Sequence, residues 1–221
     1  MTCILMIPGF MLDADLWREV RPVLERHGQV FDADTTLDGS IEAMADRAVA
    51  KLTGPTIVIG FSMGGYVARE IAYRAPDKVS SLALVATSAR GDRGSRHGSG
   101  SDAPRFQRLS RAAVAASLHP DHQTDELIAR VQQMSARLGN AVFQRQSKMV
   151  RHADAHRLAE IRCPTVVVAA ASDALRRVTE SEVLHVGIVG SSLAVIERSG
   201  HLIPLEQPAA LVHALLPILG A

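Results

Sequence analysis

Four short apolar runs, separated by segments with helical periodicity, constrain the fold of this chain more than any other feature. They lie at residues 3–7, 56–59, 79–85 and 165–169, and they are almost continuously apolar rather than alternating. Strands that are buried on both faces of a parallel sheet have this pattern. Strands that alternate with helices form βαβ units. The sequence therefore predicts an α/β fold with a doubly wound, mostly parallel sheet.

Weaker patterns complete this sheet and its helices. Residues 30–32 and 193–196 are two further candidate strands. Apolar residues keep helical spacing at 16–24, 41–52, 63–74 and 211–216. Ser40 is placed to cap the second of these helices, and Asp13 or Asp15 to cap the first. We expect Trp17, within the first helix, to be a core residue.

The interval from residue 87 to residue 151 breaks the alternation. It opens with a run rich in Gly, Ser and Arg at 88–105, for which we predict a mobile loop. Helical patterns follow at 106–118, 126–138 and 141–150. We interpret the interval as an all-helical insertion over one end of the sheet. The predicted organisation is a core of residues 1–86 and 152–221 with a helical cap, or lid, of residues 87–151.

Composition limits the class of partner. The 221 residues include 24 Lys and Arg against 23 Asp and Glu, a net charge of +1, which argues against a nucleic-acid partner. Cys3 and Cys163 are too few for a disulfide scaffold or a cysteine-rich zinc site. We find neither a signal-peptide pattern nor an apolar run of the ~18 residues that a membrane span needs. We expect a cytoplasmic protein without a membrane partner, and its oligomeric state stays open.

The motif that carries chemistry is Gly60-Phe61-Ser62-Met63-Gly64-Gly65. It follows a predicted strand directly and opens a predicted helix, which is the context of a nucleophile elbow. The sharp turn strains the serine backbone and requires small neighbours, which Gly60 and Gly64 provide. The helix N-terminus offers backbone N–H groups to a developing oxyanion.

A serine hydroxyl needs a base, and the base needs an orienting carboxylate. Both must lie at the same sheet edge, where the C-terminal ends of parallel strands meet. Asp173 comes just after the strand at 165–169, and His201 comes just after the strand at 193–196. The sequence therefore offers Ser62, Asp173 and His201 as a candidate catalytic set.

These pieces together resemble the α/β-hydrolase superfamily over nearly the whole chain. The matching segments are PGFMLDADLW, GFSMGGYVA, IRCPTVVVAAASD and GHLIPLEQP. The resemblance implies Ser62 as nucleophile, His201 as general base and then acid, and Asp173 as its orienter. It also implies an oxyanion hole made by the backbone N–H groups of Met63 and Phe10, with Met11 as the alternative to Phe10. The predicted cap then corresponds to the segment that lines the substrate pocket in this superfamily.

Three departures from the family pattern stand out. The first loop reads Pro8-Gly9 instead of His-Gly, so it lacks a side chain that often braces it. The loop after Asp173 lacks the usual proline, which predicts a different shape or less order there. The leading β-hairpin has no counterpart, so we expect six strands in the order 2-1-3-4-5-6. The pocket residues that follow from this reading are Phe10, Met11, Phe61, Met63 and Leu202.

The predicted function is hydrolysis of an ester-like bond in a small molecule through an acyl-enzyme, with carboxylesterase as the favoured activity. Lactonase, thioesterase, perhydrolase and carbon–carbon bond hydrolase activities use the same triad and stay open, as does a non-catalytic ligand-binding role. We expect no cofactor and no metal. His152 and His156 would share a face if they lay on one helix, but a third ligand is not evident. An arginine group that could attract an anionic substrate comprises Arg90, Arg93, Arg96 and Arg105.

Overall fold

The structure is a computed structural model that describes residues 2–92 and 105–220. Within these residues it contains one six-stranded sheet with the order β2-β1-β3-β4-β5-β6, in which every pairing is parallel. The strands are β1 (Cys3–Ile7), β2 (Gln29–Asp32), β3 (Thr56–Phe61), β4 (Val79–Val85), β5 (Thr165–Ala170) and β6 (Ser192–Ile196). The predicted strands, their number and their order are confirmed.

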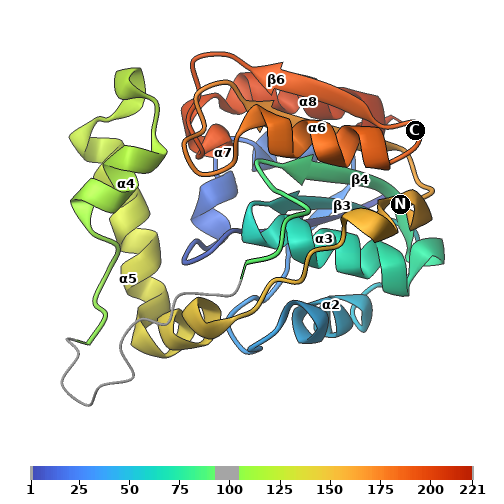
Figure 1. The fold of residues 1–221 in the computed structure, drawn as a ribbon, viewed down its shortest axis with the longest axis horizontal. Helices are drawn as coiled ribbons and strands as arrows, with labels where there is room; N and C mark the ends of the chain where they lie inside the picture. The colour runs from blue at the N-terminus through green and yellow to red at the C-terminus, as the bar shows by residue number, and fades with distance from the viewer. Residues whose placement is uncertain (1, 93–104, 221) are drawn as a thin grey trace.

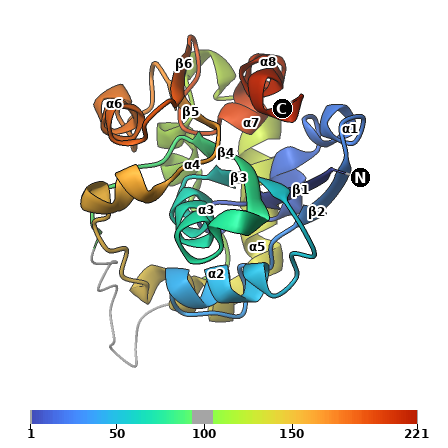
Figure 2. The same ribbon diagram turned by 90° about the vertical axis from the view of Figure 1, so that its right-hand side faces the viewer.

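Helices cover both faces of the sheet (Figures 1 and 2). Along β1 and β3 the buried side chains alternate between two apolar clusters, because neighbouring residues of a strand point to opposite faces. One cluster contains residues of α2 (Ile41–Val49), α3 (Met63–Arg74) and α6 (Val178–Gly187). The other contains residues of α1 (Arg21–Leu24) and α8 (Pro208–Leu219). The sheet is therefore the middle layer of three.

The first helical segment is shorter and more broken than the sequence predicts. In place of one helix over 16–24, the structure has a 3₁₀ turn, η1 (Ala14–Trp17), followed by the single turn α1. Pro22 has no backbone N–H, so a continuous helix through it would lose a hydrogen bond. Asp13 caps η1 as expected, because its carboxylate accepts a hydrogen bond of 3.0 Å from the N–H of Asp15.

The chain between β4 and β5 forms helices that stand beside the sheet rather than on either face (Figure 1). They are α4 (Arg111–Ser117), η3 (Pro120–His122) and α5 (Asp125–Lys148), and η4 (Ala155–Glu160) leads back to β5. The segments predicted at 126–138 and 141–150 fall in α5, apart from residues 149 and 150, and α5 is kinked at Gly139, with φ of 74°. Residues 93–104 of the predicted loop lie outside the described residues. The division into core and cap stays a prediction.

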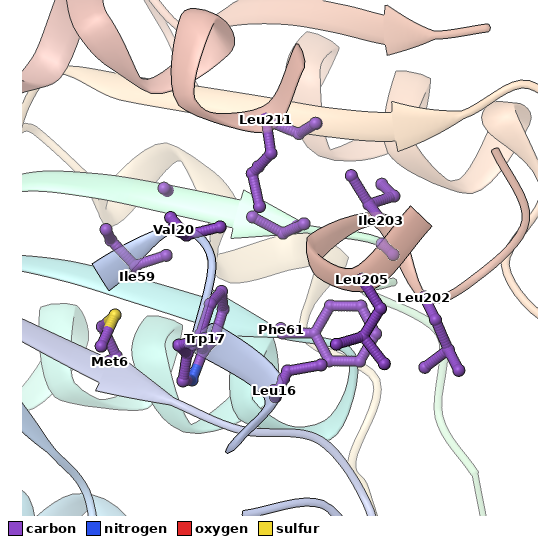
Figure 3. Close-up of a cluster of buried hydrophobic side chains, with 14 of the residues drawn as sticks. Met6, Leu16, Trp17, Val20, Ile59, Phe61, Leu202, Ile203, Leu205 and Leu211 are labelled. Carbon is purple, nitrogen blue, oxygen red and sulfur yellow. The ribbon is translucent and has the colours of Figure 1, made fainter. Parts of the chain in front are cut away.

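A buried apolar cluster fixes the end of β3 relative to the loop after β6 (Figure 3). The Phe61 ring meets the Trp17 ring edge-on, with 6.4 Å between ring centroids, and neither side chain is exposed. Leu202 and Leu205, from the start of α7 (Ile203–Glu206) and its interior, belong to the same cluster. Large aromatic rings bury much apolar surface in such packing, which stabilises the frame around the elbow. In the described part of the chain, no helix is long and apolar enough to cross a membrane.

Candidate active site

Ser62 lies at a sharp turn between β3 and α3. Its backbone has φ of 52° and ψ of −112°, in a region that non-glycine residues rarely occupy. The surrounding chain is too close for larger residues: a Cβ on Gly64 would lie 2.3 Å from the carbonyl oxygen of Ile7. One on Gly60 would lie 2.4 Å from the carbonyl oxygen of Gly64. Such strained residues cluster at functional sites because the surrounding structure must hold them in place.

A continuous chain of hydrogen bonds links the three candidate catalytic side chains. The distance from Ser62 Oγ to His201 Nε2 is 2.9 Å, and that from His201 Nδ1 to Asp173 Oδ2 is 2.7 Å. Asp173 follows β5 and His201 follows β6, so the parallel sheet delivers all three to one edge. Asp173 and His201 are 6% and 5% exposed, which keeps water from competing for these hydrogen bonds.

The carboxylate of Asp173 is fixed by its own loop. Its Oδ1 accepts hydrogen bonds from the N–H groups of Leu175, at 2.7 Å, and Arg176, at 2.8 Å. This leaves Oδ2 for His201. An ionised carboxylate only accepts hydrogen bonds, so His201 must donate Nδ1–H to it and keep Nε2 free to accept from Ser62. The loop without the family proline is therefore ordered by the acid itself.

The hydrogen bonds of the backbone N–H groups near Ser62 show which of Phe10 and Met11 has an N–H group free to bind an oxyanion. The N–H of Met11 already donates to Oε1 of Gln146 at 2.8 Å, and Nε2 of Gln146 donates to the carbonyl of Thr35 at 3.0 Å. The N–H of Phe10 has no hydrogen-bond acceptor within the described residues. Met63 is the first residue of α3, so its N–H lacks a helical acceptor. The N–H groups of Phe10, in the loop after β1, and of Met63, at the start of α3, are therefore both free to donate to an oxyanion. Gln146, on α5, is a residue that sequence reasoning missed.

A cavity of about 360 Å³ opens next to Ser62 and His201. Of the five residues predicted to line it, Phe10, Phe61, Met63 and Leu202 do so. Met11 does not: it has no exposed surface, and Leu12 lines the cavity instead. The remaining lining residues come from the helices beside the sheet and the loops around them, and they are Leu109, Ala113, Val114, Ser117, Val131, Arg151, Leu175 and Arg176.

Comparison with known proteins identifies the family of this chain. Residues 4–214 match the family described as "Alpha/beta hydrolase family". The chain belongs to the alpha/beta hydrolase family. Among curated relatives, the pimeloyl-[acyl-carrier protein] methyl ester esterase of Neisseria meningitidis is 32% identical over 191 residues, which cover 80% of this chain and 73% of the relative. A putative carbamate hydrolase of Rhizobium rhizogenes is 28% identical over 201 residues, covering 83% of this chain and 75% of the relative.

Solved structures of other alpha/beta hydrolases have the same fold. A thermophilic esterase from Thermogutta terrifontis superimposes with a TM-score of 0.81 at 27% identity, covering 100% of this chain and 90% of that one. The enol-lactonase from Burkholderia xenovorans superimposes with a TM-score of 0.85 at 18% identity, covering 100% and 92%. The second likeness concerns the fold alone.

Glu206 is a further residue of this alpha/beta hydrolase site that sequence reasoning passed over. It lies in the segment GHLIPLEQP, and its buried carboxylate binds the backbone of the His201 loop. Oε2 accepts from the N–H groups of Gly200 at 2.9 Å and His119 at 2.8 Å, and lies 3.2 Å from Nδ1 of His122. Oε1 accepts from the N–H of Leu202 at 2.9 Å. An acidic residue within an apolar stretch was the available signal.

Glu206→Gln is expected to lower kcat more than it raises KM. An amide has one acceptor oxygen, so its nitrogen would face at least one backbone N–H of the His201 loop. An unmet buried donor costs about 1–3 kcal/mol, and we expect about a 10-fold fall in kcat as the loop loosens. Steady-state kinetics and thermal unfolding test this, with the exposed Glu197→Gln as the matched control. Unchanged kcat alongside lower stability would make Glu206 a purely structural residue.

The other candidate groups do not gather at the site, as far as they belong to the described residues. His152 precedes η4 while His156 lies within it, and both are exposed, so they do not share a helix face. No group of three or more His, Cys, Asp or Glu among the described residues is arranged to hold a metal. Arg93 and Arg96 lie outside the described residues. Arg90 is exposed, 3.7 Å from Glu180, and Arg105 is also exposed.

Proposed function

We propose that this chain hydrolyses a carboxylic ester of a small molecule through an acyl-enzyme on Ser62. One observation carries the proposal: the unbroken hydrogen-bond chain from Ser62 Oγ through His201 to Asp173. A serine hydroxyl that donates to a neutral imidazole, itself oriented by a buried carboxylate, is set up for nucleophilic attack on a carbonyl.

In the first half of the reaction, Ser62 Oγ attacks the ester carbonyl and passes its proton to Nε2 of His201. The imidazolium that forms is stabilised by Asp173. The carbonyl oxygen becomes negative and accepts hydrogen bonds from the N–H groups of Phe10 and Met63. When the tetrahedral intermediate collapses, the bond to the leaving oxygen breaks, and that oxygen takes the proton from His201 and departs as the alcohol.

In the second half, a water molecule takes the place of the alcohol. His201 accepts a proton from this water while the water oxygen attacks the acyl carbonyl. The N–H groups of Phe10 and Met63 again bind the oxyanion. The bond to Ser62 Oγ then breaks, and His201 returns the proton to Oγ. One ester and one water give one alcohol and one acid, and the enzyme regains its starting state.

The cavity supports an acyl chain as the bound part of the substrate. Its volume is about 360 Å³, which suits a small molecule, and most of its lining is aliphatic or aromatic. The relative from Neisseria meningitidis is named for a methyl ester. We therefore infer an ester of a small alcohol, with the acyl chain against the residues of α4 and α5.

A cytoplasmic location is part of the same proposal.

A series of methyl esters with increasing acyl length tests the substrate class. We expect kcat/KM to rise with each methylene that the cavity buries, by a factor of about 3–4 corresponding to ~0.8 kcal/mol, and to fall once the cavity is full. Lactones and thioesters of matched size, corrected for enzyme-free hydrolysis, run in parallel. A higher kcat/KM for a lactone or thioester than for every ester would overturn the assignment.

A further inference from the structure

The cavity next to Ser62 has an unusual distribution of charge. Apart from His201, the charged side chains that line it are those of Arg151 and Arg176, and no Asp or Glu of the described residues is among its lining. The rest of the wall is apolar or carries small hydroxyls. A neutral ester with an aliphatic chain gives no reason for two guanidinium groups in this wall.

Arg151 is held rigidly at the cavity wall. Its backbone pairs with Asp92 in an isolated antiparallel bridge, with N–H to carbonyl distances of 2.7 Å and 2.8 Å. Its side chain is 10% exposed, and Nη1 donates to Oδ2 of Asp92 at 2.9 Å. Nε is buried and has no hydrogen-bond acceptor among the described residues. The guanidinium group is thus fixed in place at the wall, with one of its amino groups bonded to Asp92.

Arg176 lies on the loop of the catalytic acid. Its backbone N–H donates to Oδ1 of Asp173, which fixes where the side chain starts. Nη1 is 3.9 Å from Oε2 of Glu180, an ion pair too long for a hydrogen bond, and the side chain is 24% exposed. Burial lowers the pKa of Arg151, and the charge of Arg176 lowers it further, whereas Asp92 raises it. The two guanidinium groups therefore lie near enough in the wall for each to feel the charge of the other, and an anion beside them would attract both.

We propose that Arg151 and Arg176 form a subsite for an anionic oxygen group, a carboxylate or a phosphate, that the substrate carries away from the reacting ester. Guanidinium groups present N–H donors in a planar fork that matches both groups. The subsite rests on the proposed function, because the anion belongs to the ester that Ser62 attacks. Both arginines act in binding and touch none of the reacting atoms.

Matched esters measure whether the enzyme prefers a substrate that carries an anionic group. Monomethyl esters of straight-chain dicarboxylic acids carry one free carboxylate, and the dimethyl esters of the same acids are neutral and of similar length. Methyl esters with a terminal phosphate form a third arm and separate the two sources of charge. At neutral pH we expect kcat/KM of the carboxylate ester or of the phosphate ester to exceed that of the neutral ester by about 10-fold or more, mainly because KM is lower. Equal values for all three arms would overturn the proposal.

Variants assign the preference to the two arginines. Arg151→Met and Arg176→Met are expected to bring the anionic-to-neutral ratio of kcat/KM close to one, and Arg151→Lys to keep part of it. The control is Arg111→Met, which removes an exposed arginine of α4 that pairs with Asp125 outside the cavity. A ratio unchanged in both single variants, or an equal loss in the control, contradicts the subsite. Arg176→Met keeps the test open if Arg151→Met does not fold.

A binding measurement separates this proposal from the proposed function. Calorimetry with Ser62→Ala and the same esters needs no turnover. The subsite is supported if Ser62→Ala binds the anionic ester more tightly than the neutral one and the Ser62→Ala/Arg176→Met double variant does not. This holds even if the wild type cleaves none of the esters, because that result would count against esterase activity alone. Cleavage of every ester by the wild type, with equal binding of anionic and neutral forms by Ser62→Ala, sinks the subsite alone.

Discussion

Ser62→Ala is expected to lower kcat for ester hydrolysis by about 10⁶-fold, to the level left by the oxyanion donors and substrate binding. The change removes Oγ, the atom that lies 2.9 Å from His201 Nε2. It leaves the turn intact, because alanine also has a Cβ and the carbonyl of residue 62 keeps its hydrogen bonds from Thr87 Oγ1, at 2.7 Å, and Gly65 N–H, at 3.0 Å. Stability should therefore change little while turnover disappears.

Two measurements check this result. Burst kinetics reports the acyl-enzyme, and mass spectrometry of the protein treated with a fluorophosphonate reports the modified residue. The wild type should carry one adduct on Ser62 and the variant none. Ser80→Ala, which alters an exposed serine of β4, is the matched control and should keep full turnover and full labelling. Turnover or labelling of Ser62→Ala at the wild-type rate would remove Ser62 from the mechanism.

The sheet and the three candidate catalytic residues follow from local sequence signals. Continuous apolar runs mark strands buried on both faces, and strand order then brings Ser62, Asp173 and His201 to one edge. The elbow is equally local, because its glycines are part of the motif itself, and a Cβ on Gly60 would lie 2.4 Å from the carbonyl oxygen of Gly64. Features of this kind depend on residues close in sequence or on the general geometry of parallel sheets, which is why they could be predicted.

The supports of the site could not be predicted because they join distant parts of the chain. Gln146 reaches Met11 across 135 residues, and this contact settles which loop N–H stays free. Glu206 reaches the N–H of His119 across 87 residues. No periodicity announces such contacts, since each depends on how α4 and α5 settle against the sheet edge. The same reason explains Met11, which the sequence places in the pocket and the structure buries behind it.

Asp173→Asn is expected to lower kcat by about 10³–10⁴-fold with little change in KM. Oδ1 of Asp173 faces two backbone donors, the N–H groups of Leu175 and Arg176, so the one oxygen of an asparagine must take that side. The amide NH₂ then faces His201 and donates to Nδ1. This forces the proton of the imidazole onto Nε2, where it points at Ser62 Oγ, and His201 can no longer accept the serine proton.

A pair of variants separates this tautomer effect from loss of the loop. Asp173→Asn keeps both hydrogen bonds from the loop, so its free energy of unfolding should lie within about 1 kcal/mol of the wild-type value. Asp173→Ala loses them along with the charge and should be destabilised by about 1.5–3 kcal/mol as well as inactive. The exposed Asp121→Asn, whose partners are Arg198 and His119, is the control for loss of a carboxylate and should keep wild-type activity. If Asp173→Asn kept more than about a tenth of wild-type kcat, His201 would not depend on Asp173 for its tautomer, in spite of the 2.7 Å hydrogen bond between them. If Asp173→Asn were as unstable as Asp173→Ala, the asparagine would not keep the two hydrogen bonds of the loop, and loss of the loop would explain the loss of activity.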